Sequence, residues 1–257
     1  NQYTTPFVRV GTVVQQPVIT ATAAFNYPAG STILTITGVG FDAAGGPTKN
    51  SVQFVNPAGA SCTVTKVSST EIVCGTLNLG GAGVGQPITV TVKSFGPTNG
   101  GEVTSTQAQV GVVSADHTIT AGALQFAQQA QSVRVTGTNF GANALPGHFD
   151  ITLSTGGKCA VTSVTNALLI CKPQNPMNVG VVNAASVLLH GKAATPATIK
   201  VGDVVADPEV FNNAATIPDN SLLLTINGRN FPTAAGALDL IMEPLGTNCL
   251  VTAGSVT

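Results

Sequence analysis

Charged side chains are scarce in this chain. Only 8% of its 257 residues are Asp, Glu, Lys or Arg, against about a quarter in a typical soluble domain. Amphipathic helices need a charged outer face, so we do not expect helices to build the core. The ten Lys and Arg residues form no basic run and the net charge is −1, which argues against nucleic-acid binding. The apolar runs are far shorter than a transmembrane helix, so we expect no membrane span in this stretch.

Residue patterns that carry catalysis are also missing. There is no Gly-x-Ser-x-Gly motif, and the three histidines, His117, His148 and His190, fall at unrelated places without converging partners. We expect each histidine to take a surface or strand-edge position. The sequence therefore predicts that the chain is not an enzyme and holds no cofactor.

One group of acids invites a metal-site interpretation. Asp203, Asp207 and Glu209 lie close together in the sequence, and a calcium ion needs several carboxylate oxygens. The equivalent stretch one repeat earlier has only Asp116, so the group does not recur. We favour ordinary solvated carboxylates and predict no metal.

Glycan attachment is constrained by another absence. No Asn-x-Ser/Thr triplet occurs, so N-linked glycans are not expected. Threonines next to proline, at Thr5-Pro6, Pro97-Thr98 and Thr195-Pro196, leave O-linked glycans open as partners. The alternative is that they are plain strand and turn residues.

Glycine, threonine, valine and alanine dominate the composition. The β-branched residues favour strands, and the frequent Gly, Pro and Asn favour turns between them. The whole chain is therefore predicted to be all-β.

A cysteine hairpin recurs along the chain. Cys62 and Cys74 are twelve positions apart, as are Cys159 and Cys171, and Cys249 starts a third copy that stays unpaired in this stretch. Each complete copy is typical of two short strands around a polar turn, with the cysteines opposite each other at the open end. Disulfides explain this spacing better than zinc sites, which use closer pairs, or free buried thiols in a cytosolic protein. They predict an extracellular or cell-surface location.

A second landmark is a strand that ends in Gly-x-x-Phe. It occurs at Gly38, Gly137 and Gly228, and these glycines are 99 and 91 residues apart, which is a domain length. Each glycine has two interpretations, a special backbone angle or an ordinary turn. The sequence predicts that the three phenylalanines of the motif are equivalent core plugs: Phe41, Phe140 and Phe231.

Closing strands with a Val-Gly or similar marker end each repeat. They divide the chain into a closing strand at 1–16, full units at 17–114 and 115–205, and the first half of a unit at 206–257. A full unit holds roughly seven short strands, which fits an antiparallel β-sandwich. The linkers between units are very short, so we expect the sandwiches to form a stiff rod.

The order of these landmarks resembles the IPT/TIG immunoglobulin-like repeat. The resemblance rests on Gly-x-x-Phe, then Cys-x-Val-Thr-x-Val ending in Cys, then a closing strand, in three copies in register. It implies tandem immunoglobulin-like sandwiches like those of plexin ectodomains and fibrocystin-like surface proteins. It carries over no catalytic residues.

Three functions follow as alternatives. The first is a structural extracellular protein, a segment of a rod or filament; the others are a cell-surface adhesion or receptor ectodomain and an accessory module beside a carbohydrate-active enzyme domain. Half a sandwich at 206–257 leaves strand edges exposed, so we expect either a longer chain or end-to-end self-association through residues 1–16. These two segments amount to only 68 residues, fewer than a full unit, which favours the longer chain.

Overall fold

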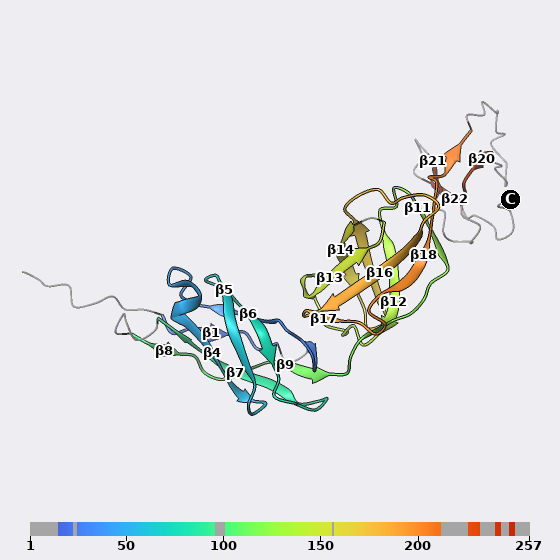
Figure 1. The fold of residues 1–257 in the computed structure, drawn as a ribbon. Helices are drawn as coiled ribbons and strands as arrows, with labels where there is room; N and C mark the ends of the chain where they lie inside the picture. Colours follow the sequence, from blue (N-terminus) through green and yellow to red (C-terminus); the bar gives the residue numbers. More distant parts are fainter. Residues whose placement is uncertain are drawn as a thin grey trace, which may run out of the picture. The chain divides into compact units, whose positions relative to one another are not determined.

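Strands make up nearly all of the regular structure. A computed structural model of the chain describes residues 15–22, 25–95, 101–155, 157–211, 226–231, 240–242 and 247–249. In these ranges the helical elements are two short 3-10 turns, η1 (Gly46–Lys49) and η3 (Pro146–His148), and neither is long enough to cross a membrane (Figure 1). The all-β prediction is thereby confirmed. The chain divides into two compact units, Asn1–Asp116 with Leu189–Lys192, and His117–Leu188 with Ala193–Thr257.

The first unit is a sandwich of two sheets, which we call the first sandwich. One sheet has the order β1 (Val18–Ile19), β3 (Leu34–Val39), β6 (Glu71–Asn78), β5 (Ser61–Val67). The other has the order β2 (Asn26–Pro28), β9 (Ala108–Ser114), β7 (Pro87–Ser94), β4 (Asn50–Asn56), with β8 (Val103–Thr104) beside β7. Alternation along the strands builds the core: in β7 the side chains of Ile88, Val90 and Val92 are buried, and Thr89 and Thr91 are only partly covered.

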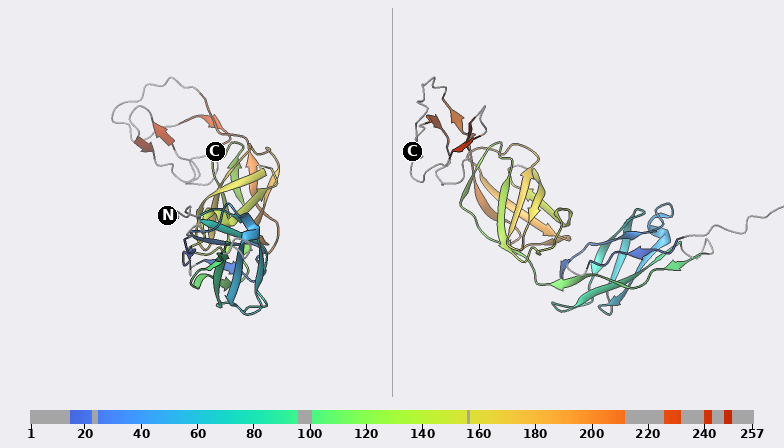
Figure 2. Two further views of the ribbon diagram at one scale, coloured as in Figure 1. Left: turned by 90° about the vertical axis from the view of Figure 1, so that its left-hand side faces the viewer. Right: turned by 180° about the vertical axis from the view of Figure 1, so that it is seen from behind.

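The second unit contains the second sandwich, whose strands form one continuous series. The order is β10 (Thr118–Ile119), β12 (Val133–Thr138), β15 (Leu168–Pro173), β14 (Gly157–Val164), β13 (Phe149–Leu153), β16 (Val182–Leu189), β18 (Ile199–Val205), β11 (Leu124–Ala127), with β17 (Lys192–Ala193) on β16. Strand β14 pairs with both β13 and β15 and so joins the two halves. Figure 2 shows the strands of each sandwich from two further sides.

Each sandwich contains one parallel strand pair, which the sequence did not predict. Strand β2 pairs parallel to β9, and β11 pairs parallel to β18. In the first sandwich the opening segment leaves the sheet of β1 and joins the other sheet, and in the second β10 and β11 lie at opposite ends of the one series. A glycine in each closing strand allows this approach. A Cβ atom at Gly111 would lie 2.5 Å from the Tyr27 ring, and one at Gly202 would lie 2.6 Å from the Phe126 ring.

The glycine of Gly-x-x-Phe lies inside a strand, so neither interpretation of it was right. A Cβ atom at Gly38 would lie 2.2 Å from the Val18 carbonyl oxygen, and one at Gly137 would lie 2.0 Å from that of Thr118. The phenylalanine ring of the same motif fills the remaining space at both places. Glycine is required because the opening strand and the ring occupy the side-chain position.

The positive backbone angle falls two residues after each of these glycines. It belongs to Gly40 (φ 78°), Asn139 (φ 59°) and Asn230 (φ 61°), where the chain turns away from the strand. The pairing is also the same in all three copies, with Ile19 opposite Gly38, Ile119 opposite Gly137 and Val210 opposite Gly228.

The third copy is described only in part. Strand β19 (Glu209–Val210) pairs with β20 (Gly228–Arg229), and β21 (Leu240–Met242) pairs with β22 (Thr247–Cys249). Phe41 and Phe140 are buried in their sandwiches, whereas Phe231 of the third copy is half-buried. Most of the closing strand predicted at 1–16 lies outside the described residues.

Candidate functional site at the seam of the first sandwich

The cysteine hairpin forms in both sandwiches. Disulfides join Cys62 to Cys74 and Cys159 to Cys171, with Cα atoms 5.6 and 5.4 Å apart. The cysteines do not lie directly opposite each other, contrary to the sequence-based expectation. Cys74 is opposite Val64 and Cys171 is opposite Val161, so each disulfide runs diagonally across the hairpin between positions two residues out of register. An irregularity in β5 and β14 shifts the register within each hairpin.

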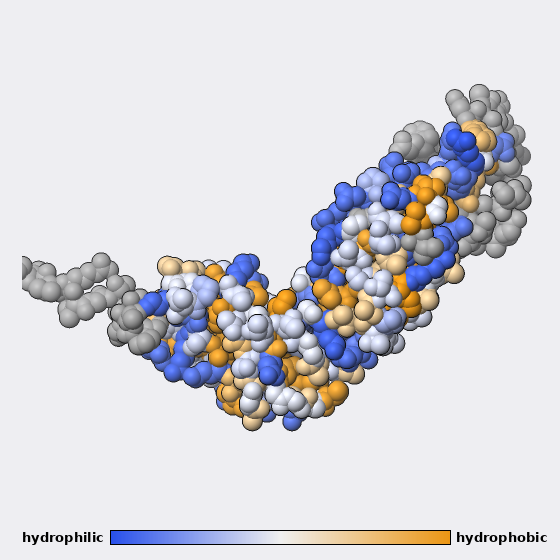
Figure 3. All heavy atoms as spheres, in the orientation of Figure 1, coloured by the Kyte–Doolittle hydropathy of each residue, from blue (hydrophilic) through white to orange (hydrophobic). Residues whose placement is uncertain are grey.

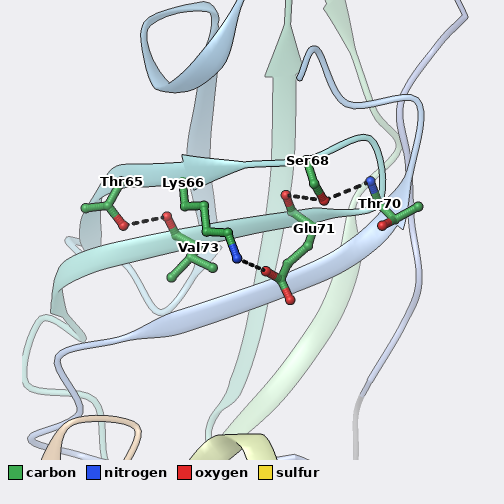
Figure 4. A network of polar contacts seen from close by, with 6 residues as sticks. All are labelled: Thr65, Lys66, Ser68, Thr70, Glu71 and Val73. Atoms are coloured by element: carbon green, nitrogen blue, oxygen red, sulfur yellow. Dashed lines mark hydrogen bonds and ion pairs between the residues drawn. The ribbon is translucent and has the colours of Figure 1, made fainter. Parts of the chain in front are cut away.

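A hydroxyl group holds the turn of each hairpin. The Ser68 hydroxyl accepts a hydrogen bond from the Thr70 N–H (3.3 Å) and donates one to the Glu71 carbonyl (3.4 Å; Figure 4). Thr165 makes the equivalent bonds in the second sandwich: its hydroxyl accepts from the Ala167 N–H (3.3 Å) and donates to the Leu168 carbonyl (3.3 Å). Lys66 and Glu71 form an exposed ion pair at 3.5 Å beside the first turn, which adds little stability.

The two sandwiches differ at one edge, which we call the seam: the line where β4 faces β5, or β13 faces β14. In the second sandwich the seam is closed by strand pairing. Ile151 lies opposite Cys159, Thr152 opposite Lys158 and Leu153 opposite Gly157. In the first sandwich β4 pairs with β7 and β5 pairs with β6, and within the described residues no pairing joins β4 to β5.

The link between the two strands also differs between the sandwiches. When the cysteines of the hairpins are aligned, Pro57 takes the place of Ser154. In the first sandwich β4 ends at Asn56, and β5 begins at Ser61 in the other sheet. In the second sandwich a three-residue link joins Leu153 to its partner Gly157, whose φ of 68° suits a tight hairpin.

The open seam leaves part of the core accessible. Ile151 and Cys159 in the closed seam are 1% and 4% exposed. Their equivalents Phe54 and Cys62 are only half-buried, although both pack against the core of the first sandwich. The first sandwich therefore leaves Phe54 and Cys62 partly accessible at an edge where the second sandwich buries Ile151 and Cys159.

A shallow groove of about 400 Å³ follows the open seam. None of its eight lining residues is charged: Pro47, Thr48, Asn50, Ser51, Val52, Cys62, Thr63 and Val64. Hydroxyl, amide and main-chain groups alternate with apolar side chains along it. None of the lining residues is an acid or a base that could activate these hydroxyls, so the groove suits a neutral, extended ligand.

Main-chain groups of β4 point into this seam. Val92 on β7 donates its N–H to the Ser105 hydroxyl (2.9 Å) and accepts from the Ser105 N–H (2.8 Å), so its main chain faces away from β4. Val52 lies directly opposite Val92. In an antiparallel ladder such a pair shares no hydrogen bonds, so the N–H and C=O of Val52 face the seam.

Asn50 fixes the start of β4 at one end of the groove. Its buried side chain donates to the carbonyls of Asp42 (2.8 Å) and Gly46 (2.7 Å). Its Oδ1 accepts from the Ser94 hydroxyl (2.7 Å) and the Asp42 N–H (3.2 Å). Every hydrogen-bonding position of the amide is used, so this residue positions the groove and has no capacity left for a ligand.

Two of the three histidines are not at the surface, contrary to the prediction. His117 and His190 are 0% and 4% exposed. His117 immediately precedes β10, where its ring lies 6.3 Å from the ring of the core residue Phe140 and its Nε2 atom lies 3.4 Å from the Val187 carbonyl. His148 is half-buried in η3, where its Nδ1 accepts the Leu145 N–H (3.3 Å), and burial lowers its pKa.

The acids near position 206 have separate partners. Lys200 bonds Asp203 (2.8 Å), the Gln129 N–H donates to Asp207 (2.8 Å), and Arg229 bonds Glu209 (2.6 Å). In the described ranges no group of three or more His, Cys, Asp or Glu residues lies close enough together to hold a metal ion.

The two sandwiches share three features: packed strands in paired sheets, a Gly-x-x-Phe glycine covered by its phenylalanine ring, and a disulfide across a hairpin. These features define a tandem immunoglobulin-like protein. The family model of the IPT/TIG domain matches residues 17–120, and this part of the chain is an IPT/TIG domain. The family predicted from the sequence is thereby confirmed for these residues. A search of curated proteins found no match.

Several solved structures resemble the chain. The plexin A4 extracellular region is 17% identical with a TM-score of 0.47, and the match covers 77% of this chain and 16% of plexin A4. The N-terminal part of the bacterial S-layer protein SbsC is 14% identical (TM-score 0.32; 74% and 44% covered). Protein SGBP-B of Bacteroides ovatus, from a mixed-linkage glucan utilization locus, is 10% identical (TM-score 0.28; 82% and 51% covered). The chain thus spans less than a fifth of the plexin A4 chain.

Proposed function

We propose that this chain is a non-catalytic structural segment of an extracellular rod or filament built from tandem immunoglobulin-like domains. The observation that carries the proposal is repetition. The corner of opening strand, glycine and phenylalanine has the same register at Gly38, Gly137 and Gly228. A chain that repeats one framework at a domain-length interval gains length and rigidity rather than a new chemical site.

The two disulfides support the extracellular part of the proposal. Disulfides persist in oxidising compartments and are rare in the cytosol. Cys62, Cys74, Cys159 and Cys171 are placed in pairs in the two sandwiches. Peptide mapping of the native protein without reducing agent tests this part, and free thiols at these four positions would remove it.

Electron microscopy of the native material tests the structural role. We expect fibres or long rods, and a denaturing, reducing gel then separates two forms of them. A band near the 25.7 kDa of this chain indicates assembly of short subunits, and a much heavier band indicates a continuous array. Isolated, non-fibrous particles in the native material would overturn the proposal.

An adhesion or receptor ectodomain is the second candidate function. It is favoured by the open seam, because a binding role predicts a distinctive surface on one unit, and the seam is open in the first sandwich and closed in the second. Binding of the isolated chain to a cell surface, in the absence of fibres, would place this candidate first.

A further inference from the structure

The open seam combines features that together define an acceptor for an extended strand. Strand β4 has a regular register with β7 from Asn50 to Phe54, and its other edge is not joined to β5. Natural sheets usually protect such an edge with charged residues, prolines or bulges. The stretch Asn50–Phe54 contains none of these.

We propose that the seam of the first sandwich is a docking surface for a second copy of this chain, whose β4 pairs antiparallel with β4 of the first. Pairing of this kind adds main-chain hydrogen bonds at a sheet edge, and alternate side chains enter the groove beside it. The choice of a second copy rests on the proposed function, since an assembly holds many copies close together.

Charge and register support a second copy as the occupant. The groove lining carries no charge, and only 8% of the chain is charged, so the chain is itself a neutral strand donor. The outward main chain of Val52 sets the register, because Val52 of each copy can exchange both hydrogen bonds with Val52 of the other. Ser51 then lies opposite Gln53 and Asn50 opposite Phe54, with no like charges facing each other.

This register also covers the accessible part of the core. Val52 and Phe54 are half-buried in one copy and share the face of β4 that packs on the core. The same two side chains of the second copy would lie over the groove, where Cys62 and Val64 line its other wall. A two-fold axis relates the two copies, which is the commonest symmetry of protein dimers.

A matched pair of charge variants tests the register on the full 257-residue chain. Ser51→Lys with Gln53→Lys places like charges opposite each other twice per dimer, whereas Ser51→Lys with Gln53→Glu places opposite charges there. Both residues are exposed, so neither variant should affect folding. By sedimentation velocity over a concentration series, we expect the first variant to raise the dimer dissociation constant about tenfold and the second to leave it near wild type.

Val52→Pro tests the main-chain bonds themselves. Because the Val52 N–H faces the seam, proline there spares the ladder with β7 while removing the donor to the second copy. We expect a folded chain by circular dichroism that no longer dimerises, and Val84→Lys, which alters an exposed residue outside the groove, should dimerise like wild type. A monomeric wild-type chain, equal dissociation constants for both charge variants, or dimers of Val52→Pro would each overturn the proposal.

The outcome is distinguishable from that of the proposed function. If the native material forms fibres and Val52→Pro dimerises like wild type, the structural role stands and the seam proposal fails. If the native material shows no fibres but dimers depend on Val52, the seam proposal stands and the proposed structural role in a filament fails. If wild-type chains stay apart and a synthetic, uncharged strand peptide occupies the groove, the second copy is the wrong occupant and the proposal fails.

Discussion

The first and second sandwiches have the same framework and differ at the seam. Both contain the glycine corner, the diagonal disulfide and the parallel strand pair. In the second, β13 pairs with β14 and buries Ile151 and Cys159; in the first, β4 and β5 remain in separate sheets and leave Phe54 and Cys62 half-buried. The link between the two strands differs as well, with Pro57 in place of Ser154. A repeated domain can thus acquire an interaction edge without altering its core. Figure 3 shows apolar residues at the surface of both sandwiches on the face drawn.

The largest effect should be common to both sandwiches. Phe41→Ala and Phe140→Ala each remove a buried ring that packs against the corner glycine, so each should lower the free energy of unfolding of its own sandwich by about 3–5 kcal/mol. Chemical denaturation of the full chain, followed with a probe in each sandwich, measures this. If Phe140→Ala left the second sandwich unchanged, the equivalence of the two units would be wrong.

Substitutions at the seam should affect the stability of the two sandwiches differently. Ile151→Ala removes side-chain atoms from a closed seam and should cost about 2–5 kcal/mol. Phe54→Ala removes more atoms, but from a half-buried side chain, and should cost less than Ile151→Ala does. The same denaturation experiment compares them, and an equal or larger cost for Phe54→Ala would mean that the first seam is closed.

The two disulfides should contribute equally to stability but should be reduced at different rates. Replacing either pair by alanine should cost about 3 kcal/mol, since each bond closes a loop of similar length. With a limiting reductant, Cys62–Cys74 should open before Cys159–Cys171, because Cys62 is half-buried beside the groove and Cys159 is buried. Alkylation and mass spectrometry of timed samples give the order of reduction, and the reverse order would contradict the contrast in exposure.

Amide hydrogen exchange should detect the open edge directly. In dilute protein the Val52 amide should exchange faster than those of Ser51 and Gln53, which face β7. In β13 the consecutive amides of Ile151 and Thr152 should both be protected, because this strand has a partner on either side. Residue-resolved exchange by nuclear magnetic resonance measures the pattern, and strong protection of Val52 at low concentration would show that its N–H is already bonded within one copy.

The smallest effect concerns pH and the second sandwich. Burial lowers the pKa of His148, so the unfolded state binds more protons below the usual histidine pKa of about 6.5. The stability that this neutral histidine contributes is therefore present above about pH 6.5 and is lost as the pH falls through its lower folded value. His148→Gln should flatten this pH dependence, and thermal unfolding of both chains from pH 7 to pH 5 compares the slopes. Identical slopes would indicate that His148 titrates alike in both states.

Local patterns predicted much of the framework. The twelve-residue cysteine spacing identified both disulfide pairs that the structure forms, and Gly-x-x-Phe identified a corner whose register recurs. The seam could not be predicted in the same way, because β4 and β13 show similar alternation and pairing across the seam depends on how the following link turns. Pro57 was the available signal, since it makes the link of the first hairpin differ from that of the second, where Ser154 stands.

Two other features that the sequence did not predict have a similar physical cause. His117 looks polar in the sequence, yet its place just before β10 puts it near Phe140 in the core. The corner glycines show no unusual backbone angle, and their requirement comes from a carbonyl on another strand. Both facts depend on contacts between segments that are far apart in the chain, which spacing and composition do not report.

The parallel strand pair, β2 with β9 in the first sandwich and β11 with β18 in the second, determines how each sandwich resists a pulling force. Strands β2 and β9 lie near the start and the end of their unit, as do β11 and β18 in the next one. When the two ends of a unit are pulled apart, parallel strands are drawn past each other along their length. The ladder bonds from Asn26 to Pro28 with Val112 to Ser114 then carry the load together in shear, whereas an antiparallel hairpin would unzip one bond at a time.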